Sequence, residues 1–285
     1  MKTGIETGAY FGDRLTDEGL AQAKAHGYDC LDYQFLADTN WEGYALQGQT
    51  FDAFFREEAR RVQAAGLEIC QTHGPWRYPP QDATPQDRQE RFEKMSRALH
   101  ATALLGSPCM VIHPIMPFGV QLNPDPKDFW ALNLEYYRRL TSIARQEGVI
   151  LCLENMPFPN LTLSRPDEIF ALVKEIDDAF FRICLDTGHC AVCGVSPATA
   201  VRRMSPWIQT LHVHDNDGRN DQHLFPYMGV MDWDRFVKGL KDAGYKGALS
   251  FETFNAIHVI DDELAQDALK FLGSVGRLFV KRIEE

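Results

Sequence analysis

Short apolar runs alternate with longer amphipathic stretches along the 285-residue chain. Eight apolar runs have the length and composition of strands: Thr3–Tyr10, Tyr28–Phe35, Leu67–His73, Pro108–His113, Val149–Glu154, Phe181–Asp186, Ile208–His214 and Ala248–Phe254. Helical spacing marks stretches between them, among them Asp52–Ala65, Pro85–Leu105, Asp128–Glu147, Arg165–Ile176, Asp232–Ala243 and Glu263–Lys281. Each such stretch is long enough to cross back over a sheet, so the pattern predicts parallel strands.

Eight β-then-α units in a chain of this length predict one domain, residues 1–285, folded as an α/β protein of the (β/α)₈ TIM-barrel type. Gly66 and Gly148 follow helical stretches at the position where glycine commonly ends a helix. A doubly wound open sheet is the alternative. It is disfavoured because no glycine-rich dinucleotide loop follows the first strand and polar residues close many strands instead of one switch point.

A potential ligand closes each apolar run from the third to the eighth: His73, His113, Glu154, Asp186, His212 and Glu252. In a parallel barrel these strand ends meet around one opening, where active sites lie. Any one of these residues alone is compatible with an ordinary solvated or hydrogen-bonded side chain. Carboxylates that end buried strands are costly unless they are paired, protonated or metal-bound, so six such placements in succession indicate a site.

Three carboxylates and one imidazole favour a divalent cation such as Mn²⁺, Mg²⁺ or Co²⁺, with Zn²⁺ as an alternative. A second set of polar residues follows closely in the sequence: His189, His214, Arg219, Asp221 and His223. His212 and His214 point to the same face of their strand. The local pattern therefore leaves open which of the two binds a metal.

The chain carries 29 basic and 40 acidic residues, for a formal charge of −11. This acidity weakens attraction to nucleic acid. Neither a signal-like apolar region at the start nor a run of about 18 apolar residues is present, so we expect a cytoplasmic protein that does not enter a membrane. Seven scattered cysteines suit reduced thiols, and the pair Cys190 and Cys193 lacks a second C-x-x-C partner for a zinc site. Homo-oligomerisation is left open.

Several segments together resemble the xylose isomerase-like superfamily, which contains sugar isomerases, ketose 3-epimerases, inosose-processing enzymes and the endonuclease IV group. The matching segments span nearly the whole chain: Thr72-His73-Gly74-Pro75, Val111-Ile112-His113-Pro114, Leu153-Glu154-Asn155, Leu185-Asp186-Thr187-Gly188-His189, Leu211-His212-Val213-His214-Asp215-Asn216-Asp217, Asp221-Gln222-His223 and Phe251-Glu252-Thr253. The resemblance implies a TIM barrel with its site at these segments.

The resemblance implies that Glu154, Asp186, His212 and Glu252 hold one divalent metal. It selects His212 because family members show a histidine followed three positions later by an acid, here Asp215. It also implies substrate contacts around this centre, which we assign to His73, His113, His189, His214, Arg219, Asp221 and His223. Arg219 lies about one position off the epimerase spacing. Tyr227 stands where the sugar-processing branch has the first glycine of a Pro-Gly-x-Gly segment.

The implied activity is isomerisation or epimerisation of a small polyhydroxy carbonyl compound, a sugar or cyclitol, through an enediolate. Glu154 and Glu252 are the expected catalytic residues, because proton transfer needs a carboxylate within hydrogen-bond reach. Four aromatic residues are candidates for the pocket wall: Trp76, Phe118, Trp130 and Phe225. The lack of a glycine-rich phosphate loop near the eighth strand favours a substrate without phosphate.

The main alternative is an endonuclease IV-like trinuclear zinc phosphodiesterase that acts on abasic DNA. All nine ligands of that enzyme group have counterparts here: His73, His113, Glu154, Asp186, His189, His212, Asp221, His223 and Glu252. Against it, Asp82, Asp87 and Glu90 interrupt the basic residues near the third strand end, where a nuclease needs a phosphate-binding rim. A noncatalytic sugar- or metal-binding module is a third alternative, which the presence of both glutamates argues against.

Overall fold

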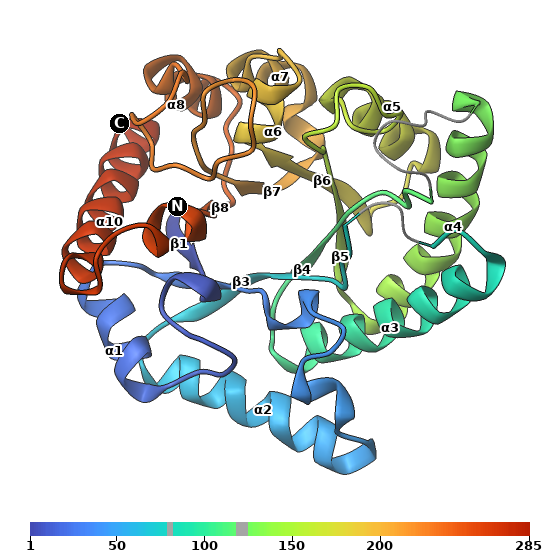
Figure 1. The fold of residues 1–285 in the computed structure, drawn as a ribbon, viewed down its shortest axis with the longest axis horizontal. Coiled ribbons are helices and arrows are strands. Elements are labelled where there is room, and N and C mark those ends of the chain that lie inside the picture. Colours follow the sequence, from blue (N-terminus) through green and yellow to red (C-terminus); the bar gives the residue numbers. More distant parts are fainter. Residues whose placement is uncertain (79–81, 118–124) are drawn as a thin grey trace.

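The computed structural model describes residues 1–78, 82–117 and 125–285. Eight parallel strands form a ring at the centre and helices surround it (Figure 1). The strands are β1 (Lys2–Glu6), β2 (Cys30–Tyr33), β3 (Glu68–His73), β4 (Cys109–Ile112), β5 (Ile150–Glu154), β6 (Phe181–Asp186), β7 (Ile208–His212) and β8 (Ala248–Phe251). The predicted (β/α)₈ barrel is confirmed, and the open-sheet alternative is wrong.

The strands follow the order β7-β6-β5-β4-β3-β2-β1-β8. Val213, just after β7, closes the ring: its amide donates to the carbonyl oxygen of Ser250 at 2.8 Å, and its carbonyl oxygen accepts from the amide of Glu252 at 3.3 Å. The closure brings the carboxyl ends of β7 and β8 together. His212 and Glu252, which are distant in the sequence, thereby reach one opening.

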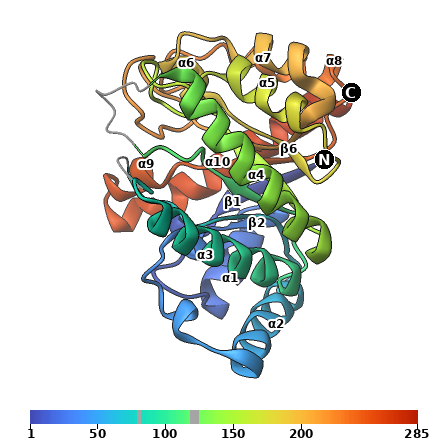
Figure 2. The same ribbon diagram turned by 90° about the vertical axis from the view of Figure 1, so that its right-hand side faces the viewer.

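The helices around the barrel are α1 (Asp17–Ala25), α2 (Gly48–Ala64), α3 (Pro85–Leu104), α4 (Pro126–Glu147), α5 (Pro166–Ile176), α6 (Thr187–Val192), α7 (Pro197–Met204), α8 (Trp233–Asp242), α9 (Phe254–His258) and α10 (Asp262–Glu284). Figure 2 shows α3 and α4 side by side on the outer surface. Local signals set their ends: Thr84 and Asp87 form a capping box at α3, and Gly148 ends α4 at a φ of 71°. No helix in these three ranges is long and apolar enough to cross a membrane.

Four predicted strands, the first, second, seventh and eighth, extend two or more residues beyond an observed end. The first ends at Glu6 because the chain turns into a 3₁₀ helix over Thr7–Ala9, with the amides of Tyr10 and Phe11 both donating to the carbonyl oxygen of Thr7. The seventh ends at His212, since only Val213 continues the pairing. Helices cover the outer face of the ring and the packed barrel interior covers its inner face (Figure 1), which explains continuous apolar runs such as the four buried residues of β4.

Cysteines line part of the barrel interior below the carboxyl ends of the strands. Cys152 and Cys184 lie two positions before Glu154 and Asp186 and are fully buried. A spacing of two places the members of each pair on the same side of their strand, which faces the barrel interior. All seven cysteines are free thiols in the structure, including Cys190 and Cys193.

Candidate metal centre

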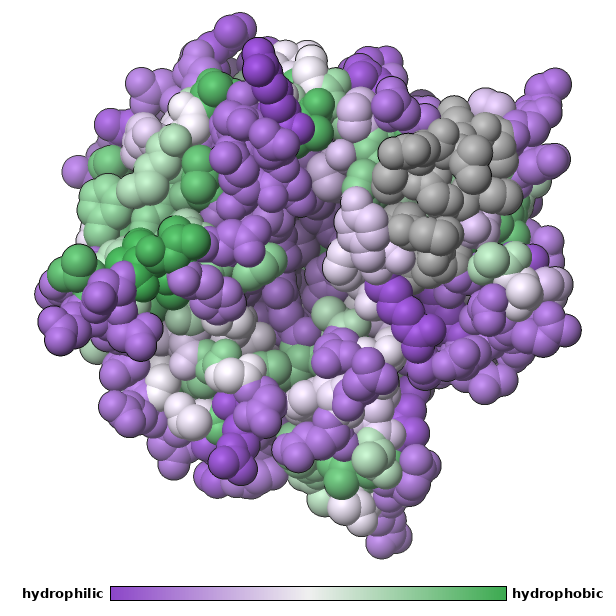
Figure 3. Space-filling model, viewed as in Figure 1, coloured by the Kyte–Doolittle hydropathy of each residue, from purple (hydrophilic) through white to green (hydrophobic). Residues whose placement is uncertain are grey.

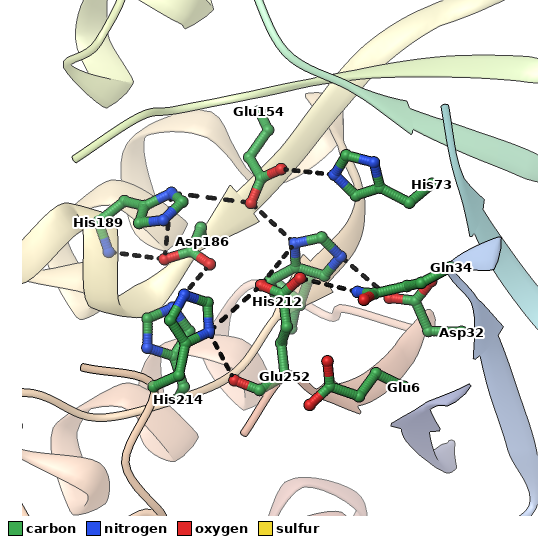
Figure 4. A network of polar contacts seen from close by, with 12 residues as sticks. Glu6, Asp32, Gln34, His73, Glu154, Asp186, His189, His212, His214 and Glu252 are labelled. Carbon is green, nitrogen blue, oxygen red and sulfur yellow. Dashed lines mark hydrogen bonds and ion pairs between the residues drawn. The ribbon is translucent and has the colours of Figure 1, made fainter. Parts of the chain in front are cut away.

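Four of the predicted ligands meet at the carboxyl ends of consecutive strands. Glu154, Asp186 and His212 end β5, β6 and β7, and Glu252 directly follows β8. One ligand atom from each lies within 4.8 Å of the ligand atoms of the other three. Figure 4 shows these side chains pointing toward one another. We call them the four-residue group.

The two nitrogen atoms of the His212 ring have different partners. Its Nδ1 lies 2.7 Å from Glu154 Oε1 and 3.3 Å from Glu252 Oε2, whereas its Nε2 lies 3.0 Å from Asp32 Oδ2 (Figure 4). Asp32 comes from β2 and also accepts a hydrogen bond from Gln71 Nε2 at 2.8 Å. This arrangement turns Nδ1 toward the other ligands and fixes the ring plane.

Asp32 is a site residue that the sequence analysis missed. It stands inside the run Leu31-Asp32-Tyr33, whereas the predicted ligands all lie where a run ends. The available signal was an acid in the middle of a buried strand, because a fully buried carboxylate needs a partner. Gln34 was also missed: its Nε2 donates to Glu252 Oε1 at 2.7 Å and thereby orients that carboxylate.

Two further groups of potential ligands adjoin the four-residue group. In the first, His113 Nε2 lies 2.9 Å from Glu154 Oε2 and 3.0 Å from His73 Nε2. The second contains His189, His214, Asp221 and His223. Asp221 Oδ2 lies 3.2 Å from both His189 Nε2 and His223 Nε2.

Glu154 and Asp186 connect these groups. Glu154 belongs to the group of His73 and His113 as well as to the four-residue group. Asp186 Oδ2 lies 2.9 Å from His214 Nε2. His212 and His214, which the sequence analysis could not separate, therefore belong to different groups.

A buried acid organises the loop that carries Asp221 and His223. Asp215 Oδ2 accepts from Trp233 Nε1 at 2.9 Å, and the backbone of Asp215 pairs in both directions with Leu224. Tyr227, which replaces a glycine of the related pattern, has a φ of 75°. The position thus keeps a left-handed conformation that a non-glycine residue adopts only at a cost of about 1–2 kcal/mol.

Burial and the nearby imidazoles have opposite effects on the pKa values of the glutamates. Burial alone would raise the pKa of the Glu154 carboxyl, but the surrounding imidazoles, His212 foremost, hold that pKa well below its usual range. The same balance lowers the pKa of Glu252 to about 2. Burial and the charge of Glu252 instead raise the pKa of Glu6 well above its usual value. The surrounding imidazoles thus favour the ionised form of Glu154 and Glu252, whereas burial disfavours the ionised form of Glu6.

Several atoms of the adjoining groups lack a partner, which fits a cation site. His113 Nδ1, His214 Nδ1 and Asp221 Oδ1 are buried and make no hydrogen bond within the described part of the chain. Buried polar atoms normally have partners. The mixture of carboxylates and imidazoles matches the donor set of a divalent transition metal better than that of a purely oxygen-seeking ion. The residues present therefore fit a divalent cation.

A cavity of about 570 Å³ opens above the four-residue group. Glu154 and Glu252 line it, as do six of the predicted substrate-contact residues: His73, His113, His189, Arg219, Asp221 and His223. His214, the seventh, is fully buried and does not belong to the described lining. Figure 3 shows a hollow at the centre of this face, surrounded mainly by hydrophilic residues.

Relatives of known sequence share parts of the chain. An uncharacterised protein of Methanocaldococcus jannaschii is 29% identical over 183 residues, 61% of this chain and 62% of that protein. A D-psicose 3-epimerase of Ruminiclostridium cellulolyticum is 28% identical over 144 residues, 50% of this chain and 47% of the epimerase. An inosose isomerase of Bacillus licheniformis is 23% identical over 172 residues, 58% of this chain and 61% of the isomerase. Each match thus spans less than two thirds of the relative.

Solved structures share the fold over nearly the full length. A D-psicose 3-epimerase crystallised in the presence of D-fructose superposes with a TM-score of 0.80 at 17% identity, covering 98% of this chain and 99% of that one. The IOLI protein with a bound zinc atom superposes with a TM-score of 0.75 at 15% identity, covering 99% of this chain and 98% of that one. A family model described as a xylose isomerase-like TIM barrel matches residues 20–275. The chain therefore belongs to the xylose isomerase-like TIM barrel family.

Proposed function

We propose that the protein is a divalent-metal-dependent isomerase or epimerase of a small polyhydroxy carbonyl compound, a sugar or cyclitol. The observation that carries the proposal is the four-residue group at the floor of the 570 Å³ cavity, with both glutamates reaching the cavity surface. Relatives named D-psicose 3-epimerase and inosose isomerase support this reaction class.

Glu154, Asp186, His212 and Glu252 would hold the cation; of the predicted ions Mn²⁺, Mg²⁺ and Co²⁺, the mixed donor set favours Mn²⁺ and Co²⁺ over Mg²⁺, and Zn²⁺ is an alternative. When bound, a divalent cation stabilises the negative charge that develops on oxygen as a proton leaves the neighbouring carbon. The remaining steps belong to the side chains of this chain.

Glu154 and Glu252 would carry the proton. They come from β5 and β8, and both are ionised, so each is able to accept a proton from carbon. One glutamate removes the proton from carbon. The other takes up a proton from solvent and delivers it to the enediolate, and the first then releases its proton to solvent. Return to the opposite face of the same carbon gives an epimer, whereas return to the neighbouring carbon gives an isomer.

Deuterium exchange tests this reaction directly. The Mn²⁺-loaded protein is incubated in heavy water with a panel of ketoses and inososes, and NMR follows the carbon next to the carbonyl. We expect solvent deuterium at that carbon and loss of exchange when a chelator removes the metal. Absence of both exchange and product with every member of the panel would contradict the proposal.

The two adjoining ligand groups keep the trinuclear zinc phosphodiesterase as a second candidate. The relatives reported above are named for epimerisation and isomerisation, which favours the sugar reaction. Incision of abasic DNA by the same preparation, without any sugar activity, would reverse this order.

A further inference from the structure

Three aromatic side chains form one wall of the cavity above the four-residue group: Trp76, Tyr78 and Phe158, the aromatic wall. The ring centroids of Trp76 and His113 are 5.3 Å apart, and the planes of the two rings meet at 71°. The ring centroid of Tyr78 lies 6.2 Å from that of Trp76 and 5.9 Å from that of Phe158, and both pairs are edge-to-face. The wall therefore begins beside a potential ligand at the floor and continues outward.

The aromatic wall is open and its base is fixed. Tyr78 exposes 62% of its surface, and Trp76 and Phe158 are half-buried. The amide of Trp76 donates to the carbonyl oxygen of Ala37 at 2.9 Å, which holds this segment against the loop after β2. A single exposed ring is common on protein surfaces, but adjacent rings lining a cavity are typical of ligand sites.

Polar side chains also line the cavity. Arg219, Asn220 and Asn255 are among them, next to the ring of Phe254, and the charged ligand groups form the floor. Hydroxyl groups of a polyhydroxy ligand would find partners there. The aromatic wall offers mainly ring faces and edges, which favour a flat apolar group through stacking and edge contacts.

We propose that the aromatic wall is a second subsite that binds a flat apolar group attached to the sugar. The substrate class is then a polyhydroxy carbonyl compound with an aromatic or similarly flat substituent away from the carbonyl, as in an aryl ether or aryl ester of a ketose, instead of a free sugar. This inference rests on the proposed function, which places the carbonyl end at the four-residue group. The cavity volume of about 570 Å³ lies within the range of about 300–1,000 Å³ that holds larger organic ligands.

Two hydroxamates separate the subsites, because a hydroxamate group chelates a divalent metal through two neighbouring oxygens. Calorimetry on the Mn²⁺-loaded protein compares acetohydroxamate with 3-phenylpropionohydroxamate. We expect the phenyl compound to bind about tenfold more tightly. Tyr78→Ala and Phe158→Ala should each narrow that ratio to below about threefold. Phe271→Ala is the matched control, since Phe271 is 52% exposed on α10 and outside the cavity, and it should keep the ratio near tenfold.

The outcomes distinguish this inference from the proposed function. Equal affinity of the two hydroxamates, or a tenfold ratio that survives in both wall variants, overturns the aromatic subsite and leaves the metal site standing. Failure of the protein to take up Mn²⁺ in the loading step overturns the metal site, and with it the substrate class argued from that site.

Discussion

Replacing Asp32 tests whether a carboxylate outside the four-residue group controls metal binding. Asp32 is fully buried, and one of its oxygens contacts both His212 Nε2 at 3.0 Å and Gln71 Nε2 at 2.8 Å. With Nε2 held by Asp32, Nδ1 of the same ring faces Glu154 and Glu252. Asp32 is thus a positioning residue for a ligand.

The expected loss of metal affinity depends on which contacts of Asp32 each variant keeps. Asp32→Ala removes the only acceptor at His212 Nε2 among the described contacts and leaves Gln71 Nε2 with only the longer 3.5 Å contact to the Leu211 carbonyl oxygen. Loss of such an outer partner typically weakens metal binding about 10- to 100-fold. We expect about 100-fold for Asp32→Ala. Asp32→Asn keeps an oxygen that accepts from His212 but loses the charge, so about tenfold is expected.

Titration of Mn²⁺ against a competing chelator measures both affinities. Asp29→Asn is the control, because Asp29 lies just before β2 but is exposed and bonds to the amide of Thr3 instead of to the site. Its affinity should match the wild type. Wild-type Mn²⁺ affinity in a folded Asp32→Ala protein would refute the argument that Asp32 orients His212.

Three other predictions follow from the same geometry and from one surface histidine. Glu252→Gln should lower turnover by at least about 100-fold even at saturating Mn²⁺, with metal content measured on the same sample because Glu252 is also a ligand; normal turnover in a metal-replete variant would contradict the role of Glu252. Elemental analysis should find one tightly held divalent metal per chain, and three zinc ions would favour the nuclease. Burial lowers the pKa of His100, but contacts with Glu147 and Asp52 outweigh it and raise that pKa above 6.5. The stabilising contribution is therefore complete below about pH 6.5 and is lost as pH rises through the folded pKa. His100→Gln should accordingly lower the melting temperature more at about pH 6 than at about pH 9, and equal shifts would show that these contacts contribute nothing.

The residues that meet at the opening were predictable, because the parallel topology and the order of residues along the chain determine which residues end the strands. Once eight β-then-α units close into a barrel, the residues that end the strands must surround one opening. Glu154, Asp186 and His212 occupy those ends as predicted. The short helices α6, α7 and α9 were not predicted, because runs of eight residues or fewer carry too little periodicity.

Loop side chains were harder to place, since no periodicity fixes their direction. Among the aromatic candidates, Trp76 lines the cavity, whereas Phe225 is buried in the core beside the Asp215–Leu224 pairing. Trp130 lies on α4 and donates to Glu175 instead of facing the cavity. Phe118 lies outside the described residues. Tyr78 and Phe158 were not candidates for the pocket wall, because a lone aromatic residue in a loop next to a proline has no distinctive sequence signal.

The network below the ligands was missed for a different reason, which lies in the alternation of the strands. Residues two positions apart share a face, so Cys184 lies below Asp186 and Thr210 below His212. These small residues leave space for Gln71 to cross from β3, where it donates to Asp32 and accepts from Thr210 Oγ1 on β7. A contact across the barrel joins residues 139 positions apart in the sequence. The alternation along a strand predicts which side a residue faces. Which residues of opposite strands lie at the same level along the barrel axis depends on the stagger of all eight strands. The ligands follow from topology, whereas the residues that orient them follow from that stagger.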